Sequence, residues 1–263
     1  MKNNSEESVM MTFGEHLDIL RKMLFRIITV VFILGVFIFA FKKETFSILL
    51  APREWNFVTY RWIEILINCI GFDFHFAEYH IDLINTELSA QFMTHISSSL
   101  YLALLGASPY IVFELFRFIT PALYESEKRY SLAVVIAVYL LFAFGVLMSY
   151  FVIFPISFRF LGTYQVDSSI ANTITLSSYI STFTMLTLIM GLVFQLPVIA
   201  FFLAKIGLIT SGVLSEYRRH AFIVVMIVAA IITPPDVFTL ILVTIPIYFL
   251  YEVSIHIVKR VEV

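Results

Sequence analysis

The stretch HAFIVVMIVAAIITPPD, from His220 to Asp236, decides how this chain folds, because it is too apolar to be exposed to water and too short to cross a membrane as a helix. The thirteen residues from His220 to Ile232 would rise only about 20 Å as a helix, whereas the apolar core of a bilayer is about 30 Å thick. Two prolines follow at once, and a helix cannot continue through them. The sequence therefore predicts a tight hairpin between a short helix and the next apolar run, which reaches Val258.

A helix this short would stop before the far membrane surface, and two arrangements are compatible with that. The bilayer can thin locally, or partner helices can cover the mismatch. Alternatively, the hairpin is re-entrant or is buried among other helices. The sequence alone leaves both arrangements open.

The composition of the whole chain places this hairpin in a membrane protein. Of its 263 residues, 60% are hydrophobic and 14% are charged, and the mean hydropathy is +0.93, whereas a soluble domain carries about 25% charged residues. The formal net charge of −2 and the lack of a Lys/Arg-rich tract argue against binding to nucleic acid. Cys69 is the only cysteine, so no intrachain disulfide can form.

Six apolar runs are candidates for membrane-spanning helices, which need about 20 residues each. The first run follows a polar N-terminal segment, residues 1–22, which has no small-residue cleavage pattern and therefore predicts a retained anchor. We expect an all-α, polytopic membrane protein with six transmembrane helices, of which the last two are short. The expected spans, within a transmembrane domain of residues 23–258, are 23–41, 92–113, 131–154, 179–203, 220–232 and 237–258.

The placement of Lys and Arg predicts the orientation, because positive residues are enriched in cytoplasmic loops. Twelve of the 17 Lys and Arg residues fall on the side that holds both termini, and five fall on the other side, where Lys42 and Lys43 oppose the trend locally. We therefore expect both termini in the cytoplasm, in a cytoplasmic (inner) membrane, and an ordered cap formed by the first exported loop. The expected exported loops are 42–90 and 155–178, and the expected cytoplasmic parts are 1–22, 114–130, 204–219 and 259–263.

Polar residues at membrane depth are costly, so each one needs a partner. Gln195 lies inside the fourth run, where its amide binds either a partner helix or substrate, or a neighbouring helix of the same chain. Pro197, two residues later, predicts a kink. Glu252, near the end of the sixth run, is expected to reach the cytoplasmic edge or to pair with Lys259 or Arg260.

The sequence contains no motif for catalysis or for cofactor binding. HFAEYH, from His75 to His80, holds possible metal ligands but lacks the HExxH spacing. There is no GxSxG, no P-loop and no glycine-rich fingerprint. We therefore expect no enzymatic activity, no cofactor and no metal.

Two acidic clusters are expected on the cytoplasmic face. In EHLDILRKML, Leu17, Leu20 and Leu24 share one helical stripe, which predicts an amphipathic helix along the membrane interface. In RFITPALYESEKRYS, residues 117–131, Pro121 ends the second span and leaves two glutamates exposed. These clusters are either ordinary interfacial charge or a docking site for a basic peptide, because carboxylates accept guanidinium groups in paired hydrogen bonds.

The same stretches resemble a known family. HLDILRKML is similar to the N-terminal HLxELRxRL signature of TatC, the multispanning core subunit of the twin-arginine protein translocase. SPYIVFELFRFITPALYESEKR resembles the first cytoplasmic loop of that family. YFVIFPISFRFL, GLVFQLP and ITPPDVFTLILVTIPIYFLYEVSI resemble its later spans in the same order, so the resemblance covers nearly the whole chain.

The resemblance implies a receptor for signal peptides that carry two consecutive arginines. Such a receptor lies among membrane lipids, self-associates in a complex with TatA-like and TatB-like single-span proteins, and exports folded cargo with the proton-motive force. By the same resemblance, Glu127 takes the acidic position of the first cytoplasmic loop that contacts the arginine pair. Phe118 and Pro121 match the Phe and Pro of that loop, and Arg21 matches the arginine of the N-terminal signature.

Three more positions match the family in or near its exported parts. Pro52 matches a proline of the first exported loop, and Tyr150 matches the tyrosine of the YF motif. Asp236 matches the aspartate that follows the double proline. The resemblance marks these three as functional positions outside the docking site.

Two positions depart from the family pattern. The acidic residue of the N-terminal signature is Ile19 here, so Asp18 or Glu15 would have to supply a second carboxylate for the docking site. The glutamate that is usual in the fourth span is Gln195, so a charge at that position is not essential to this protein.

Two other classes of function fit the sequence less well. A secondary transporter or channel for a small solute would carry paired intramembrane charges or broken helices at matching positions of two halves. Only Gln195 with Pro197 and the short hairpin fit that description, and the sequence shows no internal repeat. An intramembrane enzyme would need a nucleophile–base pair or a metal motif at depth, and the sequence has neither.

Overall fold

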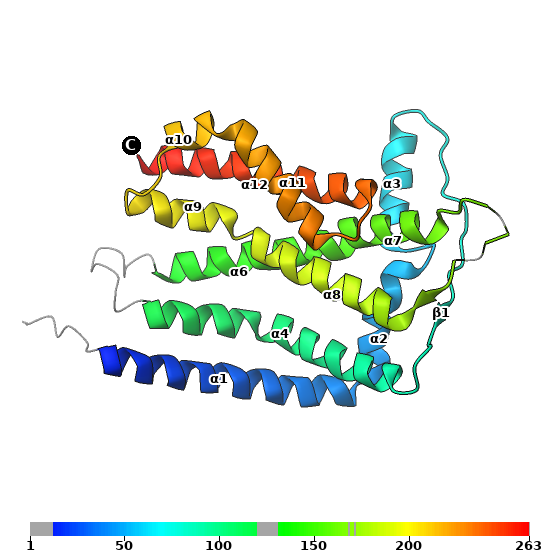
Figure 1. Cartoon of the computed structure of the whole chain (residues 1–263), viewed down its shortest axis with the longest axis horizontal. Helices are drawn as coiled ribbons and strands as arrows, with labels where there is room; N and C mark the ends of the chain where they lie inside the picture. The colour runs from blue at the N-terminus through cyan, green and yellow to red at the C-terminus, as the bar shows by residue number, and fades with distance from the viewer. Residues whose placement is uncertain (1–12, 120–130, 168, 171, 263) are drawn as a thin grey trace, which may run out of the picture.

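The long helices of the computed structural model lie side by side with roughly parallel axes (Figure 1). The structure describes residues 13–119, 131–167, 169–170 and 172–262, which are mostly helical. The helical runs are α1 (Phe13–Ala40), α4 (Ala90–Ile119), α6 (Ser131–Met148) continued by η3 (Ser149–Ile153) and α7 (Phe154–Thr163), α8 (Leu176–Val193) followed by α9 (Leu196–Lys205), α10 (Ser211–Glu216), α11 (Arg218–Ile232) and α12 (Val237–Val261).

Five runs in the described part of the chain are long and apolar enough to cross a bilayer. The helix α11 has 15 residues, which corresponds to about 22 Å, so it is as short as the sequence predicted. The helix α12 has 25 residues, so the prediction that the last two helices are both short is wrong for α12. Its apolar sequence continues through Pro246, and Lys259 and Arg260 belong to its last turn rather than to a separate tail.

The first helix begins before the first span and enters it without a break. An amphipathic helix along the membrane interface would need a bend between its leucine stripe and the span. Instead, α1 is one helix of 28 residues, and Leu17 and Leu24 are exposed on its side while Met23 is buried. The predicted interfacial segment is therefore the first part of α1 itself.

The third helical run passes through Pro155 and is longer than the sequence predicted. It ends at Thr163 rather than near Phe154, so the loop that follows begins later than expected. Proline cannot bond the carbonyl four residues before it, which here belongs to Phe151. The π-helical turn η3 accommodates the break, and the Thr59 hydroxyl donates to the Phe151 carbonyl instead. The lost helix bond is thus replaced by a contact from the cap.

Residues 42–84 form this ordered cap at one end of the spans (Figure 1). The cap consists of α2 (Lys42–Leu50), η1 (Ala51–Arg53), α3 (Val58–Cys69) and β1 (Leu83–Ile84). The helix α3 runs crosswise to the spans (Figure 1). The strand β1 pairs in parallel with β2 (Ile174–Thr175), with Leu83 opposite Ile174, so a two-residue ladder is an exception to the all-helical expectation.

Tyrosines of the spans hold the cap through its backbone carbonyls. The Tyr150 hydroxyl donates to the carbonyl of Ile48 at 2.8 Å. The Tyr179 hydroxyl donates to the carbonyl of Leu49 at 3.0 Å. Because Tyr179 and Leu49 are almost fully buried, this attachment is shielded from water, where a hydrogen bond would face competition.

Arg159, on α7, holds the loop that follows α3. Its Nη2 atom donates to the carbonyl of Ala77 at 2.8 Å, and its guanidinium lies 4.3, 4.7 and 5.1 Å from the ring centres of Phe76, Tyr79 and Tyr60. A cation placed over an aromatic ring stabilises a structure by about 0.5–2 kcal/mol. Burial raises the pKa of the Tyr60 and Tyr79 hydroxyls, so both remain protonated donors. The loop that follows α3 is therefore ordered by the third helical run.

The helices α6 and α8 approach each other closely at two glycines. A Cβ atom on Gly145 would lie 2.6 Å from the carbonyl oxygen of Met190, and one on Gly191 would lie 2.7 Å from a ring carbon of Phe142. Small residues allow membrane helices to pack with their backbones close together. The buried core continues from this contact toward the cap, and its most buried members include Ile153, Leu186, Met190, Val243 and Ile247.

Candidate functional site

A partly buried ion pair joins α1 and α4 in the half of the spans away from the cap. The Arg26 Nη2 atom donates to Glu114 Oε2 at 2.7 Å, and the Tyr110 hydroxyl donates to Glu114 Oε1 at 3.2 Å. The Nη1 atom of Arg117 lies 3.8 Å from the same Oε1. Glu114 is only 2% exposed, so side chains rather than water compensate its charge.

A cavity of about 280 Å³ adjoins this ion pair. Phe118 forms part of its wall, and the Phe118 ring lies 4.4 Å from the ring of His16 at the start of α1. The lining residues are Ile19, Lys22, Met23, Arg26, Glu114, Arg117 and Phe118. Three of these side chains are basic and one is acidic, so a guanidinium ligand would need further carboxylates from elsewhere.

The structure places the described residues that the sequence assigned to docking in different positions. Phe118 lines the cavity, together with Ile19, which stands where the family has an acidic residue. Asp18 lies outside the lining and pairs with Arg21 at 3.4 Å, and both side chains are exposed. The side chains of Pro121, Glu127 and Glu15 lie outside the part that the structure describes, so their predicted roles stay predictions.

Glu114 is the residue of this site that the sequence analysis missed. The second span was expected to end at 113, which placed Glu114 in a cytoplasmic loop, but α4 continues to Ile119 and buries the carboxylate. A signal for it was present, because Arg26 interrupts the first apolar run and a charge at that depth requires a partner.

The residues predicted to be functional near the exported face have structural contacts. Tyr150 holds α2 as described above, and Pro52 is buried in η1. The carboxylate of Asp236 caps α12, where its Oδ1 atom accepts a hydrogen bond from the backbone N–H of Thr239 at 2.6 Å. These positions lie around the junction of the cap, the third run and the α11–α12 turn.

Loss of the Asp236 cap is expected to destabilise the protein. Asp236→Ala should lower the free energy of unfolding by about 1 kcal/mol, the usual contribution of an N-cap side chain. Asp236→Asn should lose much less, because the amide oxygen can still accept from Thr239 and because Oδ2 has no described partner to lose. Equilibrium unfolding by SDS in mixed micelles measures both. Equal losses in the two variants would show that capping is not the role of this side chain.

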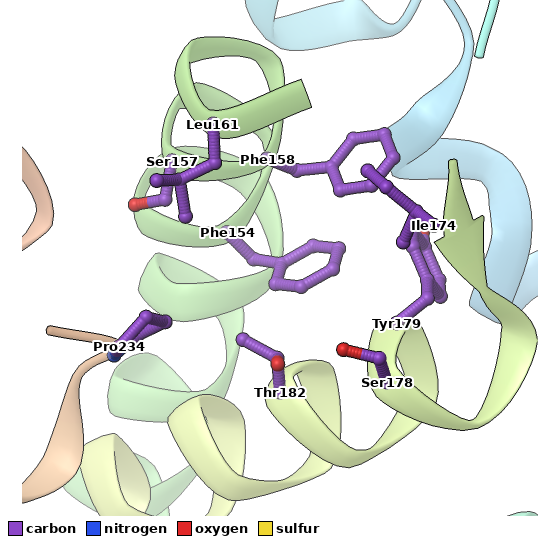
Figure 2. Close-up of a pocket in the computed structure, with 9 residues that line it drawn as sticks. All are labelled: Phe154, Ser157, Phe158, Leu161, Ile174, Ser178, Tyr179, Thr182 and Pro234. Atoms are coloured by element: carbon purple, nitrogen blue, oxygen red, sulfur yellow. The ribbon is translucent and has the colours of Figure 1, made fainter. Parts of the chain in front are cut away.

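A second cavity, of about 260 Å³, lies under the cap between α7, α8 and the α11–α12 turn. Figure 2 shows the rings of Phe154 and Phe158 reaching across it toward Tyr179, with Pro234 at its opposite side. The remaining lining residues are Ser157, Leu161, Ile174, Ser178 and Thr182. This lining has hydroxyls but no charged group, so the cavity offers no acid–base chemistry.

Gln195 makes the intrachain contact that was one of its two predicted roles. Its Nε2 atom donates to the carbonyl of Val138 on α6 at 3.1 Å, so the amide joins two helices. The predicted break at Pro197 is confirmed, because α8 ends at Val193 and α9 begins at Leu196. The side chain therefore serves helix packing here, and binding of a partner or substrate by Gln195 stays a prediction.

The predicted pairing of Glu252 with Lys259 or Arg260 is wrong. Glu252 Oε1 lies 2.9 Å from Arg218 Nε, and Arg218 Nη2 donates to Oε2 at 3.0 Å. This two-pronged contact joins the start of α11 to α12 and does not involve Lys259 or Arg260. Among the residues that the structure describes, no group of three His, Cys, Asp or Glu side chains is placed to hold a metal ion.

Comparison with known proteins gives this arrangement of helices a family. Residues 15–246 match the family described as Sec-independent protein translocase protein (TatC). The chain belongs to the TatC family. A TatC protein of Blattabacterium sp. subsp. Periplaneta americana is 35% identical to it over 261 residues, which cover 98% of this chain and 97% of that protein. A TatC protein of Helicobacter pylori strain J99 is 42% identical over 191 residues, 73% of this chain and 76% of that protein.

A solved TatC structure has the same fold. The crystal structure of the twin arginine translocase receptor TatC matches with a TM-score of 0.73 and 30% sequence identity, and the match covers 94% of this chain and 100% of that one. TatC proteins are translocase components, which is a role in transport rather than in catalysis. Together with the long apolar helices, the family makes this chain a multi-pass membrane protein with a role in protein translocation.

Proposed function

We propose that this chain is the core receptor subunit of a twin-arginine translocase and binds signal peptides at its cytoplasmic face. The contact between the start of α1 and the end of α4 carries this proposal. The ring centres of His16 and Phe118 are 4.4 Å apart. The Arg26–Glu114 pair lines the same cavity as Phe118. The described parts of the two motifs that the sequence assigned to docking therefore meet, although they lie far apart along the chain.

The proposed chemistry is recognition of two guanidinium groups by carboxylates. Glu127 is the principal acceptor, and Asp18 or Glu15 supplies a second carboxylate in place of Ile19. The Asp18–Arg21 pair is exposed and such a pair contributes only about 0–1 kcal/mol, so Asp18 can exchange Arg21 for an incoming arginine at little cost. The basic lining of the cavity repels arginines, which keeps the signal peptide at its mouth.

The proposed orientation places both termini in the cytoplasm and the cap on the exported side of a cytoplasmic membrane. In this orientation the docking surface faces newly made cargo, and the apolar part of the signal slides against the spans. TatA-like and TatB-like single-span proteins and further copies of this chain complete the complex, which exports folded cargo with the proton-motive force. The excess of Lys and Arg in the predicted cytoplasmic parts supports this orientation.

Removal of the Glu127 carboxylate should weaken docking. Crosslinking of a twin-arginine signal peptide should fall roughly tenfold in Glu127→Gln and Glu127→Ala, because a charge-assisted hydrogen bond contributes about 1.5–3 kcal/mol. A signal peptide with both arginines changed to lysines should show a similar loss of crosslinking, since lysine cannot form the two-pronged hydrogen bond.

Glu216→Gln is the matched control for this experiment, because Glu216 is exposed at the end of α10 and lies in a predicted cytoplasmic part. It should crosslink like the unmodified protein. Undiminished crosslinking in both Glu127 variants would remove Glu127 from the site, and equal export of arginine and lysine leaders would contradict the receptor function itself.

A further inference from the structure

The helix α3 of the cap carries an apolar stripe that no described part of the chain covers. Val58, Trp62, Ile65 and Leu66 fall on one side of the helix at 100° per residue, and their exposed fractions lie between 42% and 64%. A stripe of large exposed apolar side chains on a short helix marks an interaction surface. The stripe contains no charged residue.

The other two faces of α3 are already occupied. One packs on the third helical run, where the Thr59 hydroxyl donates to a backbone carbonyl of η3. The other is polar and holds the following loop, because Glu64 Oε1 accepts from the N–H of Phe76 at 2.7 Å and Asn68 Oδ1 accepts from the N–H of Phe74 at 2.8 Å. Neither of these contacts covers the apolar stripe.

The placement of α3 turns its polar face away from the spans. The helix lies crosswise at the cap end of the spans, and the loop that follows runs along the side farther from them (Figure 1). Because Glu64 and Asn68 bind that loop, the polar face of α3 points away from the spans. The apolar stripe is continuous with the spans, since the Trp62 ring stacks beside the ring of Phe151 with centres 6.4 Å apart.

The residue types of this segment match a bilayer surface. The chain has two tryptophans, and both Trp55 and Trp62 lie in this part of the cap and are exposed. Tryptophan is enriched where the apolar core of a membrane meets the headgroups. A helix with one apolar and one polar face binds in the plane of that interface.

We propose that α3 lies in the exported-side interface of the bilayer, with its apolar stripe among the glycerol and upper acyl groups of phospholipids. The level of the helix, at the end of the spans, and the contact of Trp62 with a span favour lipid over a protein as the occupant. The cap is thereby held to the membrane as well as to the helices. This inference does not depend on signal-peptide binding, so either can fail without the other.

The tryptophans of the chain allow a direct test. In the Trp55→Phe protein, reconstituted alone into phosphatidylcholine vesicles, Trp62 is the only tryptophan. Its emission should be quenched most by lipids brominated near the glycerol end of the acyl chain, less by lipids brominated near the chain terminus, and little by aqueous iodide. Quenching of the Trp62 emission by iodide, with no loss of that emission in brominated lipids, would overturn the proposal.

Cys69 provides a second reporter, because it is the only cysteine and is exposed on the same side of α3. A nitroxide on Cys69 should meet dissolved oxygen more often than a water-soluble nickel chelate. Asp73→Cys in a Cys69→Ala chain is the matched control, since the Asp73 side chain is 95% exposed on the following loop and should show the reverse order.

A charge in the stripe should expel α3 from the interface. Leu66→Glu should shift the Cys69 label toward the nickel chelate and leave the SDS unfolding midpoint unchanged, because Leu66 is largely exposed. A label on Cys69 that meets the chelate more than oxygen in the otherwise unmodified chain would contradict the proposal. A label that neither probe reaches would also contradict it, because a second copy of the chain would then cover the stripe.

Discussion

Replacement of Arg26 by leucine is expected to lower the free energy of unfolding by about 1.5–3 kcal/mol, the usual contribution of a hydrogen bond to a charged group. The partner is Glu114, whose carboxylate is almost fully buried and lies 2.7 Å from Arg26. Arg117, at 3.8 Å from the same carboxylate, remains as a longer ion pair and limits the loss. Equilibrium unfolding by SDS in mixed micelles measures the loss.

The double variant Arg26→Leu/Glu114→Leu should recover most of this stability, since removal of both charges leaves no buried ion to compensate. Arg21→Leu is the matched control, because its pair with Asp18 is exposed at both ends and should contribute less than about 1 kcal/mol. A double variant as unstable as the sum of its single variants would show that Arg26 and Glu114 are not coupled in the folded protein.

Gly145→Val should separate α6 from α8 and cost about 3 kcal/mol, the upper part of the range for overpacked cores. The Cβ atom of the new side chain would fall 2.6 Å from the carbonyl oxygen of Met190. A backbone atom cannot rotate aside, so one helix has to move. The SDS unfolding midpoint measures this change. The contact of Gln195, at the junction of α8 and α9, with Val138 of α6 should shift as well.

Two other glycines serve as controls for this variant. Gly191→Ala should cost less, because the atom it meets first belongs to the movable ring of Phe142. Gly106→Ala meets nothing within 4 Å inside α4, and it should be neutral or stabilise the helix by up to about 1 kcal/mol. Similar losses at Gly145 and Gly106 would show that the close approach of the helices does not limit the size of the residue.

Much of the fold could be predicted because the length of an apolar run is a local property. Each of the five long helical runs in the described part of the chain overlaps a predicted span, and the brevity of α11 follows from the position of TPPD alone. The break before Pro197 was equally local, since proline acts on its own helix. Pro155 is an exception, because it did not end its helix. A π-helical turn accommodates the missing backbone hydrogen bond, and Thr59, from another part of the chain, donates to the carbonyl that Pro155 leaves free.

The candidate site was harder to predict, because its contacts join residues far apart along the chain. Arg26 and Glu114 are separated by 88 positions, and neither segment contains a pattern that predicts which residue its charge will contact. Periodicity showed an apolar stripe on α1, but Leu17 and Leu24 of that stripe are exposed, so the stripe does not mark the face that packs on α4. The partner of Glu252 was misassigned for the same reason, since Arg218 reaches it only through the α11–α12 hairpin.

The way the cap is fastened has a consequence for how its sequence can change. Tyr150, Tyr179 and Arg159 all donate to main-chain oxygens, those of residues 48, 49 and 77. A main-chain oxygen is present whatever the side chain, so these bonds constrain the three donors and place no demand on the acceptor side chains. Homologous proteins should therefore keep the three donor residues, while the residue types at the acceptor positions change within the limits of local packing. A search for conserved residues at the acceptor positions would overlook this attachment of the cap.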